Sequence, residues 1–253
     1  GTASWANESS QTRVIWNWFG GGTAVSNTDG DITSSVSANT DSGFSIVSWT
    51  ADGGNASTAG HGLGSTPKIV IYKDRGVGTW YVLYTFVDGS QDYLVLNGTN
   101  ASAGLDSATY GTATSTTISN IGFTNGNNMV AYAFAEKQGF SKFGSYTGNG
   151  NADGTFVYTG FKPSFIMFKR TNSTSGWGMY DNKRTPFNLM NKRLLANTSG
   201  AEDTSADNGI NFLSNGFKWK TGSGWNASGG SYIYMAFAEN PLVGTNNVPA
   251  TAR

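Results

Sequence analysis

Carboxylates are the first residues of this sequence to consider for catalysis. A retaining glycosidase on a β-sheet needs two carboxyl groups about 5–5.5 Å apart, most simply from two acidic residues on one face of a strand. No predicted strand carries such a pair. Glu136 and Glu239 each stand alone at the end of a predicted strand, at matching positions of an internal repeat, which favours a structural role. Glu202, Asp203 and Asp207 fall in a turn-rich segment, where solvated loop residues are expected.

The single histidine and the Asp/Asn clusters offer little more chemistry. His61 stands in the stretch HGLG ahead of Pro67, which predicts a turn. The sequence has neither a Gly-x-Ser-x-Gly nucleophile elbow nor a Gly-x-x-x-x-Gly-Lys phosphate loop. Segments 52–55 and 151–154 hold too few carboxylates for calcium, which takes about six to eight oxygen ligands, so we expect turns there. We therefore predict a protein that is not an enzyme, with no catalytic residues, metal or cofactor.

Aromatic side chains beside predicted turns are the remaining candidates, and their chemistry is binding. A Trp or Tyr ring next to polar donors can hold the apolar face and the hydroxyl groups of a sugar. Trp219 and Trp225, together with Lys218, are candidate ligand-binding residues. The alternative is that both tryptophans belong to the core, as we expect for Trp80 and Trp177, which occupy equivalent positions in the repeat.

Tyr180 and Arg184 are two further candidate ligand-binding residues, because segment 180–184 has no clear counterpart in the other half of the repeat. The interpretation that we favour for this segment is an ion pair between Asp181 and Arg184 that braces a loop.

The composition indicates that β-strands must position these residues. Gly (35 residues), Ser, Thr and Asn dominate the polar positions, while Val, Ile, Phe, Tyr and Trp dominate the apolar ones. No window shows an apolar period of 3.6 residues. Short alternating runs such as 68–73 and 81–87 are separated by turn clusters, which is typical of a β-sandwich or jelly roll. With no cysteine, the fold depends on an ordinary hydrophobic core.

An internal repeat divides most of the chain into two halves. When the two halves are aligned, Pro67 matches Pro163 and Lys73 matches Lys169 at the same offset. The tetrapeptide Ala-Phe-Ala-Glu ends both halves, at 133–136 and 236–239. The sequence therefore predicts two tandem antiparallel β-sandwich units. We place them at residues 40–139 and 140–242.

The remaining segments are expected to be accessory. Residues 1–22 resemble the last strand of a preceding repeat, which suggests that the chain is part of a longer polypeptide; we expect strand 12–19 to complete a sheet edge of the first unit. Residues 23–39 are predicted to be a Gly/Ser/Thr linker, anchored by Ile32 and Val36. Residues 243–253 are predicted to be an extended tail.

The charge balance argues against two classes of partner. The 16 basic and 16 acidic residues cancel, so the chain lacks the basic surface that binds nucleic acid or an anionic membrane. No apolar run approaches the roughly 20 residues of a membrane-spanning helix. We expect neither nucleic-acid binding nor membrane insertion.

Several motifs together resemble a repeat domain of structural and tail-fibre proteins of tailed bacteriophages, especially marine ones. The resemblance covers about residues 22–240 and rests on the motifs SNTDGDI (26–32), GFSIV (43–47), GHGLG with Pro67-Lys68 (60–68), KFGSYTGNG (142–150) and NASGGSYIY (226–234). It implies a concanavalin-like, SPRY-like lectin fold in a virion appendage that contacts the host surface. The family has no agreed catalytic residues, so the resemblance assigns none here.

We thus expect a virion protein, assembled in the host cytoplasm and exposed outside the cell, that binds a host-surface glycan or receptor and contacts other virion proteins. We expect a homo-oligomer, with a trimer as the assumed geometry. The alternatives are a purely structural decoration or filament subunit, whose Trp-rich faces would be subunit contacts, and a polysaccharide depolymerase.

Overall fold

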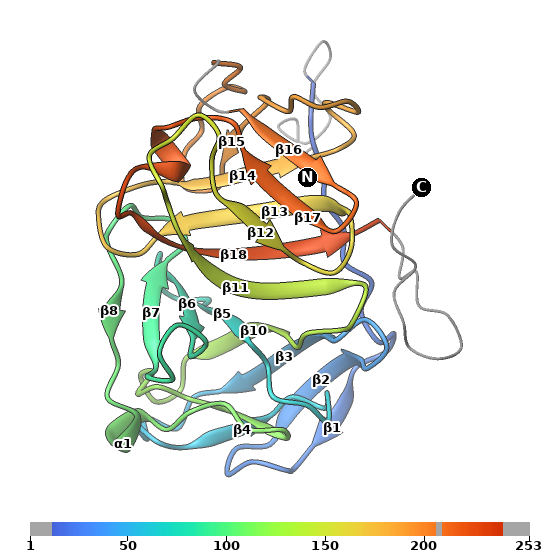
Figure 1. Ribbon diagram of the computed structural model, residues 1–253. Helices are drawn as coiled ribbons and strands as arrows, with labels where there is room; N and C mark the ends of the chain where they lie inside the picture. Colours follow the sequence, from blue (N-terminus) through green and yellow to red (C-terminus); the bar gives the residue numbers. More distant parts are fainter. Residues whose placement is uncertain (1–11, 206–208, 240–253) are drawn as a thin grey trace.

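The computed structural model describes residues 12–205 and 209–239, and their regular structure is almost entirely β (Figure 1). The first half holds β1 (Val25–Asn27), β2 (Ser34–Asn39), β3 (Phe44–Thr50), β4 (Thr58–Gly60), β5 (Ile69–Asp74), β6 (Trp80–Tyr84), β7 (Asp92–Val95), β8 (Ala103–Gly104), helix α1 (Ser107–Tyr110), β9 (Thr117–Ser119) and β10 (Asn128–Phe134). The second half holds β11 (Ser141–Thr147), β12 (Phe156–Tyr158), β13 (Pro163–Arg170), β14 (Trp177–Asp181), β15 (Leu194–Leu195), β16 (Ile210–Leu213), β17 (Gly216–Trp219), the 3₁₀ turn η3 (Gly224–Asn226) and β18 (Ser231–Ala238). The predicted all-β fold class is confirmed.

Two large antiparallel sheets share one strand order. The eight-stranded sheet runs β1-β2-β3-β10-β5-β6-β7-β8, and the five-stranded sheet runs β11-β18-β13-β14-β15. Five central strands of the first sheet, β3-β10-β5-β6-β7, therefore correspond in order to the whole of the second. Lys73 pairs with Trp80 and Lys169 pairs with Trp177, so the repeated residues occupy equivalent register positions. We call β1–β10 the first lobe and β11–β18 the second lobe.

Each large sheet has a smaller sheet over its inner face. In the first lobe this is the pair β4-β9, and in the second lobe it is β12-β17-β16. Val70 and Tyr72 of β5 point into the core of the first lobe, and Ile166 and Phe168 of β13 point into that of the second. These inner-face residues are what each small sheet covers.

The outer faces of the two large sheets pack against each other. Ile69 and Ile71 of β5 share one apolar cluster with Phe165 and Met167 of β13. Both strands are therefore buried on both faces, which explains why they read as continuous apolar runs without clear alternation. Side chains from the two large sheets make this inter-lobe core a third apolar layer.

The predicted linker 23–39 is wrong, because this segment contains two strands. β1 and β2 extend the first large sheet beyond β3. On β2, the side chains of Ser34 and Val36 are buried whereas Ser35 is exposed. Burial therefore alternates along the strand, although most of its residues are small. Serine-rich strands of this kind resemble a flexible linker by composition, which is why the sequence suggested one.

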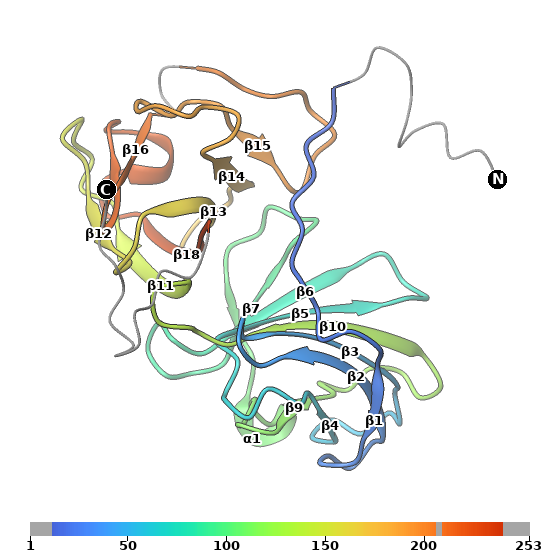
Figure 2. The same ribbon diagram turned by 90° about the vertical axis from the view of Figure 1, so that its right-hand side faces the viewer.

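The expected strand at 12–19 is also not observed, since residues 12–21 of the described chain form no strand. The segment instead runs in extended form from the first lobe toward the second (Figure 2). Trp16 and Trp18 are half-buried, and Trp18 meets Phe134 of one lobe and Phe165 of the other. Side-chain packing at the junction thus replaces the sheet-edge pairing that we expected. Residues 1–11 and the predicted tail 243–253 lie outside the described part of the chain.

Candidate ligand-binding cleft

The two tryptophans predicted to face a ligand are core residues. Trp219 is 0% exposed and Trp225 is 3% exposed, which contradicts an exposed aromatic binding surface at this position. Trp219 packs on Phe168 at 5.0 Å between ring centroids. Trp225 lies directly over Gly178, where an added Cβ would come within 2.9 Å of its ring. The alternative that both tryptophans fill the core is the correct one.

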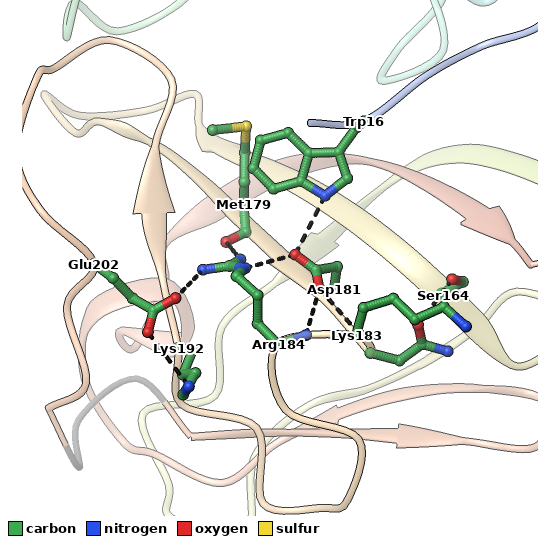
Figure 3. Close-up of polar contacts among 9 residues, drawn as sticks. Trp16, Ser164, Met179, Asp181, Lys183, Arg184, Lys192 and Glu202 are labelled. Carbon is green, nitrogen blue, oxygen red and sulfur yellow. Dashed lines mark hydrogen bonds and ion pairs between the residues drawn. The ribbon is translucent and has the colours of Figure 1, made fainter. Parts of the chain in front are cut away.

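The charged candidates take part in ion pairs. Arg184 Nε lies 2.6 Å from Asp181 Oδ2 and its Nη1 lies 2.8 Å from Glu202 Oε2, with only 10% of the Arg184 side chain exposed (Figure 3). This confirms the predicted loop-bracing ion pair. Lys218 Nζ pairs with Asp153 at 2.7 Å. Both cations, Arg184 and Lys218, are therefore already paired with carboxylates of the protein.

The same cluster anchors the N-terminal segment. Trp16 Nε1 donates to Asp181 Oδ2 at 3.2 Å, and the Arg184 guanidinium lies over the Trp16 ring at 5.7 Å (Figure 3). Burial works to raise the pKa of Asp181, but the hydrogen bonds and charge of Arg184 outweigh it and lower that pKa. Tyr180, also a predicted ligand residue, is fully buried beside this cluster and contributes to the core.

The other residues with catalytic chemistry serve the fold. Glu136 pairs with Lys142 at 2.7 Å, and Glu239 pairs with Lys183, each at the end of a central strand. His61 is fully buried, and its Nδ1 accepts from the backbone N–H of Leu63 at 3.2 Å. Burial lowers the pKa of His61. Among residues 12–205 and 209–239 no group of three or more His, Cys, Asp and Glu side chains could hold a metal ion.

An aromatic cleft in the first lobe is the feature that sequence reasoning missed. It encloses about 370 Å³ between β6, β7 and the segments around α1 and Phe123. Tyr81, Tyr93, Tyr110 and Phe123 supply most of its aromatic lining, and Asp74 supplies a carboxylate. Rings of Tyr81 and Tyr93 meet edge to face at 5.9 Å, and Tyr81 contacts Phe123 at 6.0 Å.

The cleft exists because the first lobe lacks a third strand in its small sheet. In the second lobe, β16 pairs with β17 and packs over β13, burying Ile210 and Phe212. In the first lobe, β9 has no such neighbour among the described residues, and the chain forms α1 there. The inner face of β6 and β7 is therefore left open at this point.

Aromatic residues differ between the lobes at the cleft. Tyr81 follows Trp80 on β6, and at the equivalent point of β14 the chain has Gly178, whose space Trp225 fills. Tyr93 of β7 corresponds in the repeat to Arg193, which pairs with Asp203. These two differences between the halves of the repeat are the sequence features from which the cleft could have been predicted.

Polar groups also line the cleft. Asp74 accepts from Asn127 Nδ2 at 2.6 Å and from the Gly76 N–H at 2.8 Å, which fixes its carboxylate. In the described part of the chain, the hydroxyl groups of Tyr81, Tyr93 and Tyr110 make no hydrogen bond. A carboxylate oxygen keeps a second acceptor site after one bond, and each phenol can both donate and accept.

Backbone strain marks one wall of the cleft. Ile121 adopts a φ of 43°, and Gly122 beside it also has a positive φ. A β-branched residue in this region costs on the order of 1–3 kcal/mol and concentrates at ligand sites. A Cβ at Gly122 would come within 2.6 Å of Asn55 Oδ1, so the wall leaves no room for another side chain.

The fold and the cleft together define an all-β protein with two antiparallel lobes of equivalent strand order, one of which carries an open aromatic cleft. A family model described as a domain of unknown function (DUF7483) matches residues 1–241, and the chain belongs to that family. No curated protein and no solved structure matches it. No helix among the described residues is long and apolar enough to cross a membrane.

Proposed function

We propose that this protein is a non-enzymatic saccharide-binding protein and that the aromatic cleft of the first lobe is its binding site. Its lobes would be tandem jelly-roll sandwiches of the concanavalin-like, lectin type. The resemblance of its motifs to phage tail-fibre repeats supports a place in a virion appendage, with a host-surface glycan as partner.

The observation that carries the proposal is the group of tyrosines in the cleft. A sugar ring has an apolar face and a rim of hydroxyl groups, and aromatic rings beside free phenol hydroxyls match both. The cleft volume of about 370 Å³ is at the lower end of about 300–1,000 Å³ for small-molecule sites. A site of this size suits one or two sugar rings of a longer chain.

A purely structural role in an assembly is the second candidate. Ile15 and Phe19, on the outer side of the N-terminal segment, are 75% and 81% exposed, and Phe187 is 80% exposed. Large apolar side chains at such exposure favour contacts with other subunits, including those of a homotrimer or other virion proteins. The two roles are compatible, because these residues lie outside the cleft lining.

A glycan array probed with the protein and two matched variants tests the binding role. Tyr93→Leu should abolish binding, because it removes a ring and a hydroxyl from the cleft while leaving an apolar side chain on β7. Tyr158→Leu should bind like the wild type, because Tyr158 is 61% exposed on β12 of the second lobe. Equal array profiles for both variants would contradict the proposal. Release of reducing ends from a polysaccharide incubated with the protein would indicate a depolymerase instead.

A further inference from the structure

We infer that the cleft selects an uncharged pyranose ring and discriminates against sugars that carry a carboxylate, such as uronic acids. This inference rests on the saccharide-binding function proposed above and adds the chemical class of the ligand. It follows from the charges around the cleft and from the groups that line it.

The charges at the cleft are acidic. Asp74 is the charged residue of its lining, and neither Lys nor Arg lines it. Asp106 caps the helix that ends at Tyr110. Neither of these two carboxylates forms an ion pair among the described residues. A bound uronate would therefore bring its negative charge to a site whose lining holds no basic side chain to balance it.

Two basic residues flank Asp74 in the sequence, and neither belongs to the cleft lining. Lys73 Nζ lies over the Trp80 ring at 5.7 Å and donates to the backbone carbonyl of Val77, so its hydrogen bond is made to the protein itself. Arg75 directly follows Asp74, but its side chain lines a separate groove with Ser48 and Thr50. Its backbone N–H is also fixed, by a bond of 3.0 Å to the Asn128 carbonyl. Successive side chains of a strand point to opposite faces, so Asp74 and Arg75 serve different surfaces. The Arg75 guanidinium is thus not part of the cleft.

Uncharged sugar hydroxyls, by contrast, match the cleft. The carboxylate of Asp74 keeps acceptor sites for hydroxyl groups, and the hydroxyls of Tyr93 and Tyr110 can donate or accept. The rings of Tyr81 and Phe123 present apolar surface for the C–H face of a pyranose. Hydrogen bonds to a fixed carboxylate are roughly twice as strong as those between neutral groups.

Saturation-transfer NMR and calorimetry with paired sugars test this selectivity. The probes are the methyl glycosides of glucose and galactose against those of glucuronic and galacturonic acid, which differ only at C6, together with rhamnose and N-acetylglucosamine. We expect the neutral member of a pair to bind at least about tenfold more tightly at low salt. The gap should narrow at 0.5 M NaCl, where charges at the cleft mouth are screened.

Variants assign the discrimination to the cleft. Asp74→Asn should narrow the gap between neutral and acidic sugars, whereas Tyr110→Phe should weaken both without changing their ratio. If Asp74→Asn fails to fold, the salt dependence of the wild-type protein decides in its place. Equal or tighter binding of uronates in the cleft would overturn this inference and leave the saccharide-binding function standing. Absence of binding by every sugar of the panel and by the glycan array would overturn the function itself.

Discussion

Lys169 lies on β13 with its side chain fully buried at the junction of the two lobes. Its Nζ donates to the carbonyl of Thr99, in the first lobe, at 3.4 Å and to that of Arg170 at 2.7 Å. Both partners are neutral, and no ion pair of Lys169 exists among the described residues. Burial lowers the pKa of Lys169 from 10.5 to about 8. The equivalent Lys73 is half-exposed and lies over the Trp80 ring.

Lys169 should make the stability of the protein depend on pH. Between about pH 8 and 10.5 the unfolded chain holds a proton on this residue that the folded chain has released, so the free energy of unfolding rises with pH in this interval. Below pH 8 both states are protonated and the dependence ends. Chemical denaturation at a series of pH values should show this rise in the wild type.

The matched variants are Lys169→Met, which removes the rise, and Lys68→Met, which keeps it because Lys68 is exposed. Burial raises the pKa of Tyr72, Tyr180 and Tyr234, so ionised tyrosines oppose the rise at the highest pH. Both variants retain these tyrosines, and the difference between their curves isolates Lys169. Identical curves for the two variants would refute the assignment.

Some residue roles could be predicted from the sequence and others could not. The Asp181–Arg184 ion pair followed from short spacing, and local spacing is what a sequence records directly. The burial of Trp225 depended on Gly178 of a distant strand, which leaves room for its ring. Tyr93 gave no signal by type, because tyrosine is as common in cores as in binding sites.

At the scale of elements, the extended segment 12–21 connects the lobes without strand pairing. Trp18 makes edge contacts with Phe134 of the first lobe and with Phe165 and Phe237 of the second, at 6.1, 5.5 and 5.5 Å. Gly21, three residues on, has a backbone that approaches Ala38 so closely that a Cβ would lie 2.0 Å from its carbonyl oxygen. The segment is thus fixed at both of these points.

Trp18→Ala should lower the free energy of unfolding by about 2 kcal/mol. A fully buried Trp loses about 3–5 kcal/mol on this change, and Trp18 is half-buried. Ile15→Ala is the control and should change stability by less than about 0.5 kcal/mol, because Ile15 is 75% exposed. Urea denaturation measures both. A loss no larger for Trp18→Ala than for Ile15→Ala would show that the segment does not hold the lobes.

Element types were easier to predict than element partners. Strands β5, β10, β13 and β18 followed from repeated apolar runs bounded by turns. The strands β1 and β2 escaped notice because serine carries little strand signal. The presence of β16 in one lobe and α1 in the other decides where the cleft opens, and this depends on which segments pack together. The local sequence of a short segment does not determine which other segment it packs against, so the position of the cleft could not be predicted.

For the whole molecule, the inter-lobe core makes the two lobes one unit. Phe44 and Leu94 of the first lobe share a cluster with Trp177 and Met235 of the second. Polar bonds border it: Trp177 Nε1 donates to the Val95 carbonyl at 2.8 Å, and the Ser102 N–H donates to Thr171 at 2.8 Å. Either lobe alone would expose the outer face of its large sheet to water.

The protein should therefore unfold in a single transition, and a change in the inter-lobe core should destabilise both lobes. Met167→Ala removes a 7%-exposed side chain at this core and should cost about 2–5 kcal/mol. Calorimetry should show one peak at a lower temperature. Hydrogen exchange should accelerate in β10 as well as in β18. Two separate peaks, with only that of the second lobe displaced, would contradict the coupling.

The open cleft also determines where this protein can change its sequence without losing its fold. Tyr81 and Tyr93 are half-exposed because no third strand covers them, whereas Phe212 and Trp225 on the corresponding side of the second lobe are buried. Substitutions at the half-exposed cleft residues should cost little stability, while comparable substitutions in the second lobe create cavities. The duplicated architecture thus separates a half that tolerates substitution from a half whose packing does not, and under the proposed function a change of ligand would require variation in the first lobe alone.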